Sequence, residues 1–89
     1  MKSFNNNNQQ LLDYLVSLSS ELKKRGLLEL SEMLGFAIGN ASSMSTEFLG
    51  ESRIALRQVL QQGREALTEQ ERDDVQGVLK QLDKAFDKR

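Results

Sequence analysis

The sequence contains no cysteine, histidine, proline or tryptophan. The absence of cysteine excludes disulfides and thiolate nucleophiles, and the absence of both cysteine and histidine removes the usual zinc ligands. The side chain most used for acid–base chemistry near neutral pH is missing as well. We therefore expect a protein that is not an enzyme, with no catalytic residue, no cofactor, no bound metal and no small-molecule substrate.

An excess of charge of either sign is also missing, because 12 lysines and arginines face 13 aspartates and glutamates. Binding to nucleic acid normally needs a basic excess, so we expect no nucleic-acid partner. The longest uncharged stretch, residues 33–46, has far fewer apolar residues than the roughly 20 that span a bilayer. The N-terminus lacks the apolar segment of a secretory signal. We expect a cytoplasmic protein with no membrane partner.

Leucine is abundant and β-branched residues are sparse, a composition that favours helices. Apolar residues recur three and four positions apart, as in Leu11, Leu15, Leu18 and Leu22, and this spacing is typical of an amphipathic helix. Similar patterns follow along the chain. They predict four helices at about residues 9–25, 27–39, 46–62 and 69–87.

Helix boundaries carry recognisable signals. Gly26 follows a basic last turn and is well placed to end the first helix. Thr68 and Glu71 have the spacing of a capping box, which predicts the start of the fourth helix. Short connections favour antiparallel neighbours, so we expect an all-α fold, a small antiparallel four-helix bundle. Residues 1–8 are expected to be a flexible polar N-terminus, and residues 9–89 a single helical domain. A homodimer would bury apolar surface that an 89-residue chain alone cannot, so we expect self-association.

The predicted second helix contains a GxxxG spacing at Gly35 and Gly39, with Phe36 beside it. Two glycines one turn apart allow another helix to approach closely, although each costs about 1 kcal/mol relative to alanine. One interpretation is tight packing inside the protein, with Gly39 ending the helix. The other is a partner-binding or self-association surface, with Phe36 as its exposed anchor.

Residues 27–36 resemble the first helix and turn of a helix-turn-helix DNA-binding motif. Ser31 would be the small residue that packs on the second helix, and Gly35 the glycine that turns the chain. The resemblance implies a recognition helix near residues 38–48. That segment has no arginine or lysine, on which base readout and phosphate anchoring depend.

The predicted third helix carries a basic stripe, formed by Arg53, Arg57 and Arg64. Arginine is favoured at protein interfaces because its planar group binds carboxylates with two hydrogen bonds. The acidic residues 69–74 at the start of the fourth helix are an alternative, internal partner for the stripe. Ile54 points away from the apolar face of its helix, so we expect it to be exposed or to contact a partner.

The sequence therefore favours a non-enzymatic helical protein-interaction module, of the adaptor, inhibitor or immunity type, that acts through an exposed helix face. The protein partner is unidentified. The residues expected to bind it are Gly35, Phe36, Gly39, Arg53, Ile54, Arg57 and Arg64. The alternative is a small helix-turn-helix DNA-binding regulator.

Overall fold

The computed structural model describes residues 8–39 and 46–87, and within these ranges the chain forms helices joined by turns. The elements are α1 (Asn8–Lys24), α2 (Leu28–Gly39), α3 (Thr46–Gln62), the short 3₁₀ helix η2 (Arg64–Ala66) and α4 (Glu69–Asp87). Each α-helix begins and ends within one residue of its predicted bounds, and the predicted all-α fold is confirmed. The predicted flexible N-terminus falls on residues 1–7, outside the described part, and on Asn8, which begins α1.

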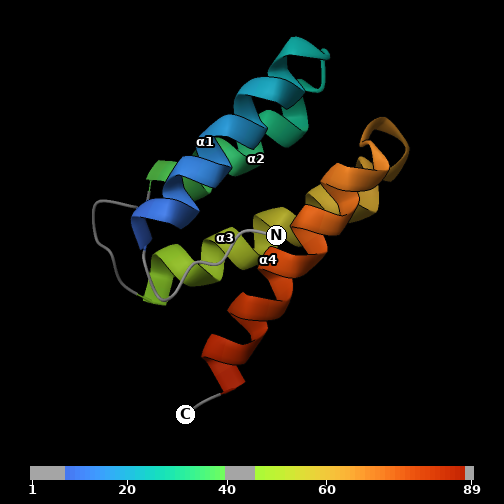
Figure 1. The fold of residues 1–89 in the computed structure, drawn as a ribbon. Helices are drawn as coiled ribbons and strands as arrows, with labels where there is room; N and C mark the ends of the chain where they lie inside the picture. The colour runs from blue at the N-terminus through green and yellow to red at the C-terminus, as the bar shows by residue number, and fades with distance from the viewer. Residues whose placement is uncertain (1–7, 40–45, 88–89) are drawn as a thin grey trace.

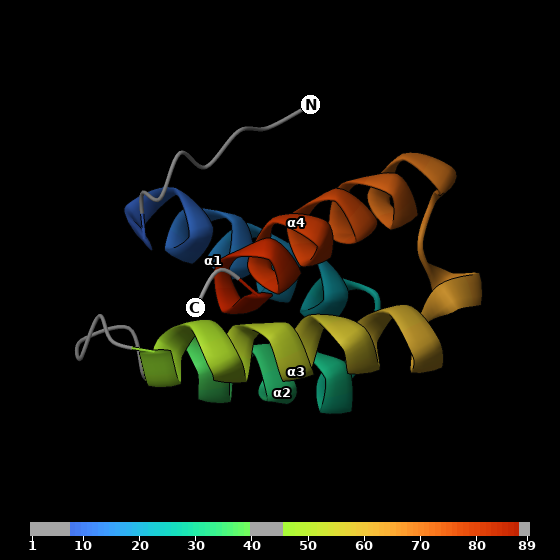
Figure 2. The ribbon, with the colours of Figure 1, turned by 90° about the horizontal axis from the view of Figure 1, so that it is seen from below.

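The four α-helices form two layers. α1 packs on α2, α2 on α3 and α3 on α4, and successive helices run in opposite directions (Figure 1). Seen from below, α2 and α3 make one layer, whereas α1 and α4 make the other (Figure 2). One outer face of the molecule therefore belongs to α2 and α3 alone.

The end of α1 shows why the chain turns where it does. Gly26 has a φ of +82°, a left-handed conformation that glycine adopts without a steric penalty. The Gly26 N–H donates to the Lys23 carbonyl and the Leu27 N–H to the Leu22 carbonyl, both at 3.0 Å. These two bonds form a Schellman motif, which satisfies the last carbonyls of the helix. The predicted end of the first helix at Gly26 is confirmed.

The core lies between the two layers and draws on all four helices. Its largest fully buried side chains are Phe48, Leu15, Leu22, Leu34, Leu56, Val59 and Val75. One polar side chain, that of Ser52, is fully buried among them, and its hydroxyl donates to the Phe48 carbonyl at 2.7 Å. Because that bond satisfies the hydroxyl, burying it costs little.

Gly63 fixes how closely the end of α3 approaches α2. A Cβ at this position would lie 2.6 Å from Leu30 Cδ1 and 3.0 Å from the Val59 carbonyl oxygen. A larger residue here would make the Leu30 side chain shift, so glycine suits the close packing and also ends the helix.

Candidate interaction site

Phe36 is exposed because of its place in the helical repeat of α2. Leu30, Leu34 and Ala37 occupy the side of the helix that faces the core. Phe36 lies roughly opposite Leu34 at 100° per residue, and 66% of its surface is exposed. The predicted exposure is confirmed, while a role in partner binding stays a prediction.

Ile54 has the equivalent position on α3. Ala55, Leu56 and Val59 face the core, whereas Ile54 is 56% exposed, as the spacing predicted. Exposed large apolar residues are few in the described part of the chain: Val16, Leu28, Phe36 and Ile54. Three of these four, Leu28, Phe36 and Ile54, therefore lie on the adjacent helices α2 and α3 of one layer.

A groove of about 290 Å³ runs between these two side chains. Met33 and Phe36 line it from α2, and Glu51, Ile54, Ala55 and Gln58 line it from α3. An engineered cavity of about 150 Å³ holds a benzene molecule, so this groove has room for about two apolar side chains. The sequence singled out Phe36 and Ile54 separately, and the structure brings them to one site.

A second hollow, of about 390 Å³, lies further along the same two helices and was not predicted. It is lined by Gly26, Leu27, Leu28, Glu29 and Leu30 on one side and by Gln62 on the other. Leu28, beside it, is 55% exposed. The sequence signal was the run of three leucines at 27, 28 and 30, because one face of a helix cannot bury all of them.

The two glycines of the GxxxG spacing lie on the surface. No atom of the described residues comes within 4 Å of a Cβ built at Gly35 or Gly39. The interpretation as tight internal packing is therefore wrong, although Gly39 does end α2 as predicted. Both glycines lie beside Phe36 on the outer side of the helix, where they leave the backbone uncovered.

The helix-turn-helix interpretation is wrong in its geometry. α2 continues without a break through Gly35, which was expected to turn the chain. Ser31, expected to pack on a following helix, instead meets the preceding one. Its hydroxyl lies 2.9 Å from that of Ser19 and donates to the Ser19 carbonyl at 3.1 Å. Ser31 is therefore a structural contact between α1 and α2.

The arginines predicted to form one stripe are divided. Arg64 lies in η2, beyond the end of α3, so it does not continue the stripe. Arg53 Nε and Arg57 Nη2 both pair with Asp83 Oδ1, at 2.7 and 3.2 Å. Asp83 lies late in α4, so the acidic start of that helix is not their partner, contrary to the alternative interpretation. Both arginines pair with this residue of α4, and neither lines the groove.

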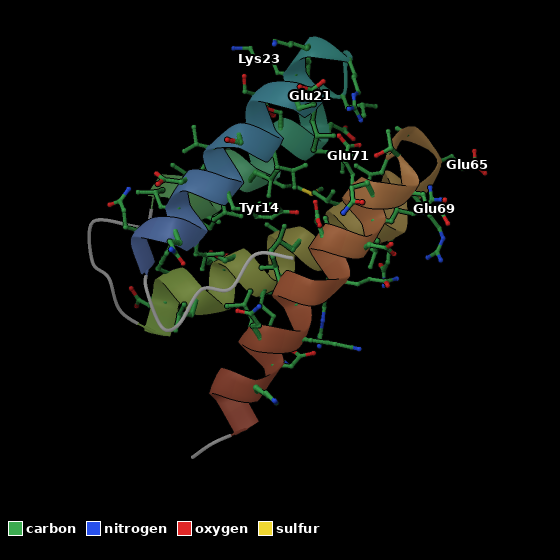
Figure 3. The ribbon with its side chains drawn as sticks, in the orientation of Figure 1. Tyr14, Glu21, Lys23, Glu65, Glu69 and Glu71 are labelled. Carbon is green, nitrogen blue, oxygen red and sulfur yellow. The ribbon has the colours of Figure 1, made fainter. Side chains whose placement is uncertain are left out.

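A charged contact with two parallel hydrogen bonds joins α1 and α4, the two helices of one layer, at one end of the molecule. Arg25 donates to Glu71 Oε1 and Oε2 at 2.8 and 2.7 Å, and to the Ala66 carbonyl at 3.0 Å. Glu71 also completes the predicted capping box: it accepts from the Thr68 N–H at 2.9 Å, and its own N–H donates to the Thr68 hydroxyl at 3.1 Å. We call these contacts the Arg25–Glu71 clamp. It connects the end of α1 with the start of α4 (Figure 3).

The clamp and its surroundings shift two pKa values. Hydrogen bonds from Arg25 lower the pKa of Glu71 to about 2, although partial burial opposes the change. The Tyr14 side chain points from α1 toward α4 (Figure 3), and burial raises its pKa, with a smaller contribution from the charges of Asp74 and Glu71. Tyr14 therefore stays protonated and packs, partly buried, against the core. Neither group lies near the α2–α3 groove.

Two other kinds of site are absent from the described ranges. Residues 8–39 and 46–87 hold no group of three or more acidic side chains placed to bind a metal ion. Within the same ranges no helix combines the length and the apolar character that crossing a bilayer requires. The groove between Phe36 and Ile54 brings together two of the three exposed large apolar residues of this layer.

Comparison with known proteins gives no relative: no protein-family model, no curated protein and no solved structure matches this chain.

Proposed function

We propose that this chain is a non-enzymatic protein-interaction module, of the adaptor, inhibitor or immunity type, and that it binds a helix of another protein through the outer face of α2 and α3. One observation carries the proposal. Phe36 and Ile54, on different helices, are 66% and 56% exposed and border the same groove. Exposed apolar residues that cluster over a groove are typical of protein–protein contact sites.

The energetics support the same conclusion. Fully burying a phenylalanine or isoleucine side chain contributes about 1.5–3 kcal/mol, so the exposed halves of these two would each contribute about 1–2 kcal/mol in a complex. Aromatic residues near the centre of a contact often carry much of its binding energy. We therefore expect Phe36 to be the main anchor and Ile54 to support it.

The other predicted binding residues divide into those that adjoin the groove and those that lie away from it. Gly35 and Gly39 adjoin Phe36 and lie within reach of the same partner. Arg53 and Arg57 pair with Asp83 of α4 and do not line the groove, and Arg64 lies in η2. We therefore leave all three outside the proposed site. A homodimer and a cytoplasmic location stay predictions from the sequence.

Photo-crosslinking in cells of the source organism tests the proposal. A photoreactive amino acid is placed at position 36, 54 or 16 in separate variants. Val16 is the matched control, because it is 48% exposed and lies on α1, in the other layer. We expect positions 36 and 54 to give an adduct of the same mass and position 16 to give none. Equal adducts from all three positions, or none from 36 and 54, would refute the proposed site.

A further inference from the structure

The two hollows between α2 and α3 also indicate what kind of partner fits, and this inference rests on the proposed function. We propose that the occupant is an amphipathic helix of a partner protein, with an apolar stripe facing the groove and lysines or arginines along its flanks.

The spacing of the two hollows along α2 and α3 suits a helix. The lining residues of α3 extend from Glu51 to Gln62, about 16 Å at a rise of 1.5 Å per residue. On α2, Phe36 and Glu29 mark the two hollows and lie two turns apart. A helix laid along a groove inserts apolar residues at i, i+3 or i+4, and i+7, which matches two hollows at this separation. A partner helix of about three turns would fill both.

The charged residues that line the two hollows have one sign. Glu51 lines the first hollow and Glu29 the second, and the described lining residues include no cation. Glu32 and Glu47 are exposed on the same two helices. α2 has no lysine or arginine, and both arginines of α3 reach toward Asp83 instead. A partner with cations beside its apolar stripe would therefore complement the rim of the groove.

The same charges argue against a second copy of this chain as the occupant. In a two-fold symmetric dimer an interface patch meets itself. Glu29 and Glu51 of one copy would then face the carboxylates of the other, with no cation from α2 between them. Repulsion between like charges would oppose such a pairing. If the predicted homodimer exists, its interface is elsewhere.

Two synthetic peptides test the proposal with the full-length protein. Both are amphipathic helices of 14 residues with leucines at i, i+3, i+4 and i+7, a length chosen to cover about three turns and one end residue on each side. One has lysines at the flanking positions and the other has glutamates. We expect the lysine peptide to bind at least about tenfold more tightly in calorimetry, and its affinity to fall as salt is added. NMR shifts should centre on Met33, Phe36, Ile54 and Ala55.

Variants separate the groove from general attraction to negative charge. The double variant Glu29→Lys with Glu51→Lys should lower the affinity for the lysine peptide about tenfold. Each ion pair between a peptide lysine and one of these glutamates contributes up to about fivefold in affinity. The control, Asp13→Lys with Asp73→Lys, changes the net charge equally on exposed positions of α1 and α4. It should leave the affinity within about twofold. Phe36→Ala should lower the affinity for both peptides.

Several other outcomes would overturn either this inference or the proposed function. Equal affinity for the two peptides, no binding by either, or equal effects of the two double variants would overturn the proposal. So would a dimer in solution that Phe36→Glu converts to a monomer, because the occupant would then be a second copy. A crosslinked partner whose contacting helix has no basic flank would refute this inference and leave the proposed function intact. Absence of any adduct at positions 36 and 54 would refute the proposed function itself.

Discussion

Replacing Glu71 with glutamine tests the Arg25–Glu71 clamp directly. The substitution keeps the size of the side chain and removes its charge, so the paired hydrogen bonds from Arg25 lose their charged acceptor. The bond to the Thr68 N–H is weakened as well. We expect the folded state to lose stability without a change in fold, because the core residues are untouched.

The expected magnitude follows from the pKa of Glu71. A fall in pKa from 4.5 to about 2 would contribute about 3 kcal/mol to the free energy of unfolding at neutral pH if the carboxylate were fully buried. The Glu71 side chain keeps 24% of its surface exposed, so solvent screening lowers the expected contribution to about 1–2 kcal/mol. For a domain of this size that is a fall in Tm of about 5–15 °C.

The sign of the pH dependence is fixed by the same pKa. Because folding lowers the pKa of Glu71, its carboxylate stabilises the folded state above about pH 4.5. The contribution is lost as the pH falls from about 4.5 toward 2. The stability difference between wild type and Glu71→Gln should therefore be full at pH 7 and close to zero at pH 2.

Urea unfolding followed by circular dichroism at several pH values is the assay. Glu69→Gln is the matched control: Glu69 lies in the same first turn of α4, and its carboxylate makes none of the hydrogen bonds of the clamp. It should cost only the helix-dipole contribution, about 0.3–1 kcal/mol. If the two variants lose equal stability at pH 7, or if the effect of Glu71→Gln persists at pH 2, the clamp does not act as described.

Two further predictions concern stability. Gly63→Ala should lower the free energy of unfolding by about 1–3 kcal/mol because its Cβ would meet Leu30 and the Val59 carbonyl, whereas Gly35→Ala should raise it by about 0.5–1 kcal/mol because the space there is open. Thermal unfolding of both variants checks these opposite signs. Changes of the same sign would contradict the packing described for α2 and α3. Asp83→Asn should cost less than about 1 kcal/mol of unfolding free energy and lose most of its effect in 1 M salt, since its pairs with Arg53 and Arg57 are partly exposed. A loss of stability in urea unfolding that salt does not reduce would show that solvent screening does not limit these pairs.

Much of the fold was predictable because its signals are local. The leucine spacing of α1, Gly26 at its end and the capping box at Thr68 each act through contacts within a few residues. Such contacts depend little on the rest of the chain, so the sequence pattern alone predicts them. The helix bounds therefore agreed to within one residue.

The candidate site was predictable only in part. Helical spacing shows that Phe36 and Ile54 leave the apolar face of their own helices, and both are exposed. Spacing within one helix does not show which neighbour lies beside it, so the groove that joins them was not predicted. For the same reason the alternative interpretation placed an internal partner for Arg53 early in α4, whereas its partner is Asp83, late in that helix.

The Arg25–Glu71 clamp also bears on how the chain reaches its folded state. It joins residues 46 positions apart, whereas α1 with α2 and α3 with α4 pair as neighbours along the chain. Closing a short loop costs less entropy than closing a long one, so each helical hairpin can form before the two hairpins meet. A contact that closes after the rate-limiting step slows unfolding and leaves the folding rate unchanged. The clamp would then set the lifetime of the native state rather than the speed of its formation.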